Sequence, residues 1–173
     1  MHSFSQSTAT NINKYATLKI TNSAKEMMMN NYESIIVGVD LNADTDAITI
    51  ERAKQLAKMY NAKLYLVHAV ESLNAYGTPY IDIAVADIEK EISTAHKQQL
   101  LQEAAQQGIP TDALIVEIGT PTNVIIEQAQ KIQADLIIVG AHSHHGLSLL
   151  LGSTTDSILH DAPCDVLAVH LNK

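Results

Sequence analysis

Residues 139–160 read VGAHSHHGLSLLLGSTTDSILH, and this stretch decides which fold class the chain fits. It runs from an apolar strand end, through a loop containing Gly140 and Gly146, to Gly-Ser-Thr-Thr starting at Gly152. The backbone N–H groups at the start of a helix have no partner within the helix and attract anions. The stretch therefore predicts a strand, a glycine loop and a helix start that together can seat a phosphate.

Five apolar runs set the pattern for the rest of the chain. Each run is continuous rather than alternating, which is typical of strands buried on both faces. The runs cover residues 34–40, 63–71, 112–118, 135–140 and 164–171. Helical patterns separate them, at residues 44–60, 81–107, from Thr120-Pro121 onward, and 153–161. This alternation predicts a single-domain α/β fold, a doubly wound parallel sheet of five strands with helices on both faces.

Two details of this pattern can be checked against a structure. The helix over residues 81–107 is expected to bury an apolar stripe made of Ile81, Val85, Ile88, Ile92 and Ala95. Asp40 is expected to end the first strand and Gly140 to end the fourth. Parallel sheets bind ligands at the carboxyl ends of their strands, where the strand order reverses. If these two strands are neighbours, both residues face one crevice.

Composition and charge narrow the classes of function. The 173 residues are 46% hydrophobic and 17% charged, with a formal net charge of −8. An acidic chain without a basic stripe argues against binding to nucleic acid or to an anionic membrane. Transmembrane helices need about 18 consecutive apolar residues, and no such run is present. Cys164 is the single cysteine, which suits a reducing, cytoplasmic location.

The N-terminal segment differs in composition from the remainder. Residues 1–30 are rich in Ser, Thr and Asn and lack an apolar region of the secretory type. We expect these residues to form a disordered arm, followed by one domain over residues 31–173.

Four segments together resemble the universal stress protein family over residues 31–173. They are IIVGVD, LYLVHAVE, VGAHSHHGLSLLLGST and APCDVLAV. The resemblance implies a Rossmann-like fold of the adenine nucleotide alpha hydrolase type, with strand order 3-2-1-4-5. It also implies a homodimer paired through the last strand, from Cys164 to Leu171.

The resemblance further implies a choice between two subgroups. Some members bind ATP or AMP through the loop pattern G-x2-G-x9-G-[ST], whereas A-type members lack this pattern. Here Gly140 matches the first glycine, Ser143 replaces the second, and eight residues separate Ser143 from Gly152. If Ser143 needs a positive φ, it weakens a site by about 1–2 kcal/mol without abolishing it.

The candidate cofactor-binding residues follow from the motifs and the resemblance. The family's adenine contacts correspond to Gly38, Asp40 and Ala69. The glycine loop and helix start supply the rest, namely Val139, Gly140, His142, Ser143, Gly152, Ser153, Thr154 and Thr155. Asp40 fits two interpretations, a contact to Mg²⁺ or ribose and a plain turn residue. Ser153 also fits two, a phosphate contact and an ordinary helix N-cap with Asp156 as its capping-box partner.

Histidines of this region carry weaker signals. His142, His144 and His145 lie in one loop, where neighbouring histidines seldom share a metal ion, so we expect no metal site. His142 is the best placed of them to contact phosphate. His68, inside the second strand, is expected to be a hydrogen-bonded core histidine.

The sequence argues against catalysis. No Lys or Arg lies between Lys131 and Lys173, whereas NTPases of the P-loop class use a loop lysine. We therefore expect a stress-response sensor or regulator that binds ATP or AMP, with Mg²⁺ accompanying a triphosphate, and is not an enzyme. The alternative is an A-type dimer that binds no nucleotide and acts through protein contacts. An adenylate-using enzyme of the same architecture is a third interpretation.

Overall fold

The computed structural model describes residues 32–73, 82–142 and 152–171. These residues form one five-stranded sheet in which all neighbouring strands are parallel, ordered β3-β2-β1-β4-β5. The strands are β1 (Ser34–Gly38), β2 (Lys63–Val70), β3 (Leu114–Ile118), β4 (Leu136–His142) and β5 (Asp165–Leu171). The predicted fold class and strand order are confirmed.

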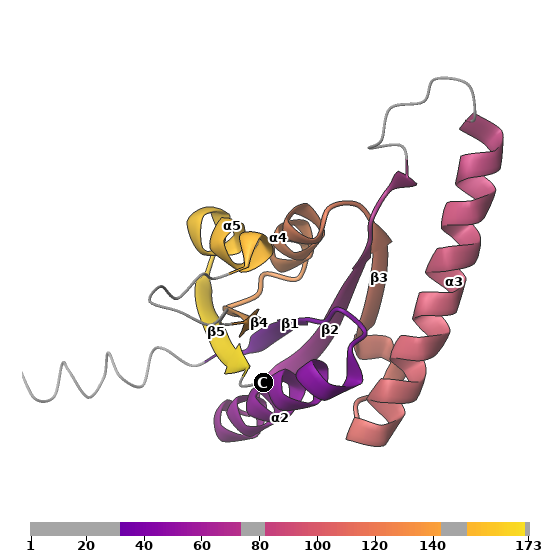
Figure 1. Ribbon diagram of the computed structural model, residues 1–173. Coiled ribbons are helices and arrows are strands. Elements are labelled where there is room, and N and C mark those ends of the chain that lie inside the picture. The colour runs from indigo at the N-terminus through magenta and orange to yellow at the C-terminus, as the bar shows by residue number, and fades with distance from the viewer. Residues whose placement is uncertain (1–31, 74–81, 143–151, 172–173) are drawn as a thin grey trace, which may run out of the picture. The chain divides into compact units, whose positions relative to one another are not determined.

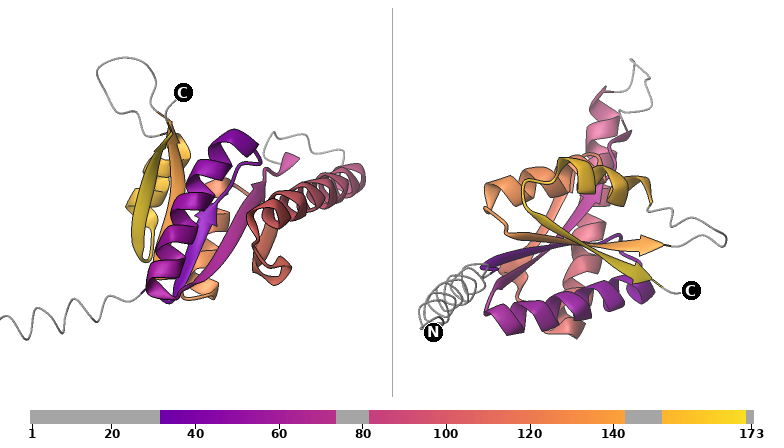
Figure 2. Two further views of the ribbon diagram at one scale, coloured as in Figure 1. Left: turned by 90° about the horizontal axis from the view of Figure 1, so that it is seen from below. Right: turned by 90° about the vertical axis from the view of Figure 1, so that its left-hand side faces the viewer.

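Four helices cover the two faces of this sheet (Figures 1 and 2). They are α2 (Ala43–Tyr60), α3 (Asp82–Gln107), α4 (Pro121–Lys131) and α5 (Ser153–Asp161). Successive strand residues point to opposite faces. Ile35 and Val37 pack in the cluster that holds Ile50 of α2 and Leu100 of α3. Ile36 packs in a second cluster with residues of α4 and α5, which include Ile125 and Ile158. The continuous apolar runs are explained by these two cores.

Several predicted strand ends are wrong by a few residues. β1 ends at Gly38, so Asp40 lies beyond the strand. The third strand does not start at residue 112, because Thr111–Ala113 form a 3-10 turn. β4 does not end at Gly140 but continues to His142, because pairing with β5 runs on to Leu171. Gly140 is therefore a strand residue rather than the first residue of a loop.

The predicted stripe on α3 is also partly wrong. Ile88 is 46% exposed, whereas Glu89 next to it is buried at 8% exposure. The Glu89 carboxylate accepts hydrogen bonds from the Ser72 hydroxyl and the Leu73 N–H, both at 2.8 Å. Figure 1 shows the first half of α3 extending beyond β3, where little of the sheet remains to cover it. Ile81 lies outside the described residues, as do the predicted N-terminal arm, Ser143, His144, His145 and Gly146.

Candidate functional site

A cavity of about 410 Å³ opens at the carboxyl edge of the sheet, between the ends of β1 and β4. β1 lies between β2 and β4 in the sheet, so this is the point where strand order reverses. The wall contains all the predicted binding residues except two, as follows: Gly38, Asp40, Ala69, Val139, Gly140, Gly152, Ser153, Thr154 and Thr155. His142 ends β4 but its side chain lies outside the described part of the chain, and so does Ser143.

The floor of the cavity depends on two glycines. A Cβ atom on Gly38 would lie 2.7 Å from Cδ1 of Ile125 and 3.2 Å from Cγ1 of Val139. A Cβ atom on Gly140 would lie 2.7 Å from Cδ1 of Leu171. Neither glycine has a positive φ. They are needed for close packing under the cavity, and Gly140 does not form the sharp bend expected from the sequence.

The start of α5 forms the opposite wall. Gly152 is the N-cap, with φ −54° and ψ 153°, and no side chain of the described residues caps this helix. Ser153 is therefore the first helical residue, and the interpretation of Ser153 as an ordinary N-cap is wrong. A Cβ atom on Gly152 would have no neighbour within 4 Å among the described residues. The uncapped N–H groups and the helix dipole make this end of the cavity favourable for an anion.

Thr155 connects this helix to the sheet through a side-chain hydrogen bond. Its side chain is buried at 4% exposure, and its hydroxyl donates to the Gly140 carbonyl oxygen at 3.0 Å. The hydroxyl proton is thus used within the protein, although Thr155 lies in the wall. Ser153 and Thr154 are more exposed, and they are the hydroxyls free to face a ligand.

Replacing Thr155 by valine tests how much this hydrogen bond contributes to stability. Valine keeps the shape but leaves the Gly140 carbonyl without this donor, so we expect a loss of about 1–2 kcal/mol in the free energy of unfolding. Urea unfolding of both proteins measures the change. A valine variant as stable as the wild type would show that the bond contributes nothing.

Asp40 behaves as a turn residue in this structure. Its Oδ1 accepts the Asn42 N–H at 3.1 Å, which fixes the bend between β1 and α2. The side chain is exposed at the cavity. A turn role and a ligand contact are therefore compatible, and the second stays a prediction.

Asp46 is a wall residue that the sequence reasoning missed. Only 5% of it is exposed, and its carboxylate accepts the Asp40 N–H at 3.3 Å and the Asn42 N–H at 3.1 Å. Burial, and next the charge of Asp40, raise the pKa of Asp46 to about 7. The available signal was its position three, four and seven residues before Thr49, Ile50 and Ala53, on the apolar face of the predicted helix.

The raised pKa makes stability depend on pH in a defined direction. The folded protein holds the Asp46 proton up to a pH of about 7, whereas the unfolded chain releases it near 3.8. The contribution of the protonated group is complete below the unfolded pKa and is lost as the pH rises through the folded one. We therefore expect Asp46→Asn to gain stability relative to the wild type between about pH 5 and about pH 8. Urea unfolding at both values measures this gain, and a constant difference would contradict it.

His68 is the core histidine that the sequence predicts. It is 6% exposed, and its Nδ1 donates to the Val39 carbonyl at 2.9 Å. Because a carbonyl only accepts, the His68 Nε2 must accept from Nδ1 of His96, 2.8 Å away, when His68 is neutral. Burial lowers the pKa of His68 and favours that neutral form. The same residue also forms part of the cavity wall, which the sequence reasoning did not foresee.

The charged groups of the wall are acidic. Among the described residues it contains Asp40, Asp46 and Glu71, and neither lysine nor arginine. No cluster of three metal-binding side chains occurs in the described ranges. An anionic ligand would therefore meet backbone N–H groups and hydroxyls rather than fixed cations.

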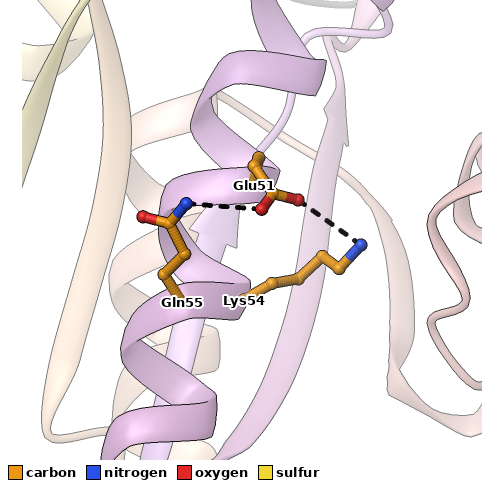
Figure 3. A network of polar contacts seen from close by, with 3 residues as sticks. All are labelled: Glu51, Lys54 and Gln55. Carbon is orange, nitrogen blue, oxygen red and sulfur yellow. Dashed lines mark hydrogen bonds and ion pairs between the residues drawn. The ribbon is translucent and has the colours of Figure 1, made fainter.

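A second, open groove of about 820 Å³ lies at the amino edge of the sheet. It contains Lys54, Lys58 and Lys63 together with the acidic Glu51 and Asp112. Figure 3 shows Glu51 joined to Lys54 at 3.6 Å and to Gln55 at 3.4 Å. Exposed pairs of this kind contribute at most about 1 kcal/mol. Its charges face solvent and one another, so this groove is a weaker candidate for a ligand site.

None of the helices that the structure describes has the length and apolar character required to cross a membrane.

Comparisons with known proteins agree on one family. The family described as the Universal stress protein family matches residues 31–170. Universal stress protein A homolog 2 of Coxiella burnetii is 43% identical over 143 residues, which is 83% of this chain and 98% of the relative.

Two solved structures are similar as well. Universal stress protein UspA from Lactobacillus plantarum has a TM-score of 0.63 at 26% identity, covering 80% of this chain and 98% of the other. A universal stress protein in complex with cAMP has a TM-score of 0.50 at 26% identity, covering 81% and 98%. The match to the family model and the 43% identity over nearly the whole of a relative lead to one conclusion: the chain belongs to the universal stress protein family.

Proposed function

We propose that this protein binds an adenine nucleotide, AMP or ATP, in the cavity at the carboxyl edge of the sheet. One observation carries the proposal. Residues from four separate segments, predicted from the sequence to contact a nucleotide, converge on a single cavity in the fold. Its volume of about 410 Å³ lies in the range of about 300–1,000 Å³ that small-ligand sites occupy.

The proposed orientation follows from the chemistry of the two walls. Gly38, Asp40 and Ala69 lie on the β1 and β2 side, which offers backbone groups and a carboxylate to the base and ribose. Gly152 and Ser153 lie on the α5 side, where uncapped N–H groups favour phosphate. A related protein of known structure is in complex with cAMP, which supports the same class of ligand.

Turnover is expected to be slow or absent. Transition states of phosphoryl transfer are stabilised by lysine, arginine or metal ions placed around the transferring group. The described wall supplies neither of these side chains. Mg²⁺ would accompany ATP and offset the acidic groups of the wall. The protein is accordingly proposed to be a cytoplasmic stress-response sensor whose nucleotide occupancy is the signal, rather than an enzyme.

Mass spectrometry of small molecules released by denaturation tests the proposal without assuming a ligand. The protein is purified in parallel with a Gly152→Leu variant and both are denatured. We expect AMP or ATP from the wild type and a strong reduction in the variant. Equal amounts from both proteins would show that any nucleotide released comes from elsewhere.

We also propose that two copies pair through β5. This strand forms an edge of the sheet, since β4 is its neighbour on one side within the described chain. Val166, Leu167 and Ala168 are only half-buried in one copy, although all three are apolar. A long apolar edge strand favours pairing with another chain, and a two-fold dimer closes it.

An A-type protein without nucleotide is the second candidate function. The loop departure at Ser143 favours it, and so does the similarity to a relative named as a universal stress protein A homolog. Such a protein would act as a dimer through protein contacts. The same release experiment separates the two, because the A-type candidate predicts no nucleotide from either protein.

A further inference from the structure

The connection between β1 and α2 is the part of the cavity wall that depends most on side-chain support. Its residue Leu41 has a φ of 61°, a left-handed conformation that is unfavourable for leucine. The Leu41 carbonyl accepts from Gln99 of α3 at 3.0 Å. The Val39 carbonyl accepts from His68 of β2. The connection is thus held in its conformation by groups from two neighbouring elements.

Asp46 is the third side chain that holds the connection between β1 and α2 in place. It accepts the N–H groups of Asp40 and Asn42, on either side of Leu41, and is 5% exposed. These bonds set where the exposed Asp40 side chain stands in the cavity. Asp46 therefore controls the shape of the wall on which the base and ribose are proposed to lie.

The groups that face Asp46 give it little electrostatic compensation. Asp40 on the connection and Glu103 on α3 both act on it with negative charge. Glu103 has a buried Oε2 without a hydrogen-bond partner in the described chain. His68 on β2, hydrogen-bonded to His96 on α3, has its pKa lowered by burial, which disfavours a compensating positive charge. The cavity residues of β4, β5 and α5 in the described chain are uncharged.

We propose that Asp46 is a positioning residue that binds a solvent proton more tightly when an anionic nucleotide is bound, so that nucleotide affinity falls as the pH rises. The inference rests on the proposed function. A nucleotide brings further negative charge to a wall that already holds Asp40 and Asp46, and the least costly response is to neutralise the more buried carboxylate. The protonated carboxyl keeps a carbonyl oxygen that accepts one N–H, and its new O–H can donate to Asp40.

The pH range of this response follows from the empty protein. Burial and Asp40 already raise the pKa of Asp46 to about 7. A bound anion raises it further. For a further rise of about one unit, affinity falls about fivefold between about pH 7 and about pH 9. The phosphate of AMP is about 90% ionised or more over this range, since a phosphate monoester has a second pKa of about 6.

Calorimetric titration with AMP tests the inference. Titrations at about pH 8 in two buffers of different ionisation enthalpy give the number of protons taken up per nucleotide. Wild type, Asp46→Asn and Asp44→Asn are compared. Asp44 lies exposed in the same turn of α2 and outside the cavity wall, so it is the matched control for loss of one charge. We expect proton uptake and the fall in affinity in wild type and Asp44→Asn, and neither in Asp46→Asn.

A second variant keeps the test decisive if Asp46→Asn does not fold. Asp40→Asn removes the neighbouring charge, so the fall in affinity should shift to lower pH. Equal proton uptake in wild type and Asp46→Asn, or an unshifted pH midpoint in Asp40→Asn, would overturn the inference and leave the proposed function intact. AMP binding to none of the proteins would overturn the proposed function and the inference with it.

Discussion

Replacing Gly152 by leucine is expected to weaken AMP binding at least about a hundredfold, which corresponds to a loss of about 2.7 kcal/mol in binding free energy. None of the described residues lies within 4 Å of the Cβ position of Gly152, and its φ of −54° suits any residue. The fold therefore accepts leucine, at a loss of about 1 kcal/mol for a poorer N-cap. The leucine side chain would occupy the space in which phosphate approaches the N–H groups of α5. Calorimetric titration with AMP measures the affinity, and urea unfolding measures the stability.

The control for Gly152→Leu is Asp161→Leu. Asp161 is exposed at the last residue of the same helix and is not part of the cavity wall. The Asp161→Leu variant adds a leucine side chain to α5 without obstructing the phosphate position, so its AMP affinity should stay close to that of the wild type. A Gly152→Leu protein that is folded and binds AMP within about threefold of the wild type, or about 0.7 kcal/mol, would refute the placement of phosphate at α5.

A proline in β5 is expected to dissociate the proposed dimer. Proline lacks a backbone N–H and is tolerated in a strand only where that group does not face a partner strand. The N–H groups of Leu167 and Ala168 face opposite sides of β5, because successive residues of a strand alternate. One of the two faces β4, which pairs with β5 over Ile138 and Val139. The other faces outward, toward the proposed second copy.

The two single variants Leu167→Pro and Ala168→Pro therefore act as controls for each other. We expect one variant to be folded and monomeric, with its dimer dissociation constant raised at least about a hundredfold, since a two-fold interface loses the bond twice. The other should be destabilised as a monomer. Light scattering gives the mass in solution, and circular dichroism checks the fold. A monomeric wild type at about 10–50 μM, where a micromolar dimer is mostly associated, or two folded dimeric variants, would contradict pairing through this strand.

The sequence predicted the layers of the fold well, because strands that are buried on both faces of a parallel sheet consist of continuous apolar runs. It predicted the ends of the strands less well, since those depend on how far each strand pairs with its neighbouring strand. Gly140 looks like the end of a strand, but pairing between β4 and β5 carries the ladder on to His142 and Leu171. The predicted apolar stripe on α3 was partly wrong for a similar reason. Whether Ile88 is covered depends on how far the sheet extends beneath the helix, which periodicity does not encode.

The candidate site was likewise predicted only in part from the sequence. The motifs and the family resemblance identified nine residues of the wall, and the structure places them around one cavity. Asp46 was missed because the motif search looked at strand ends and glycine loops, whereas this residue reaches the cavity from inside α2. Its role comes from two backbone N–H groups that the fold brings to it. Thr155 was assigned to the ligand, which stays a prediction, and its hydroxyl donates to the Gly140 carbonyl oxygen.

Direct titration of the wild-type protein with AMP, and with ATP in the presence of Mg²⁺, tests the central claim most directly. We predict a dissociation constant in the micromolar range, about −8 kcal/mol in binding free energy, one nucleotide per chain, and competition between the two ligands for the same cavity. Absence of binding heat with either nucleotide at about millimolar concentration, corresponding to about −4 kcal/mol, would contradict the claim and favour the A-type protein that acts through protein contacts.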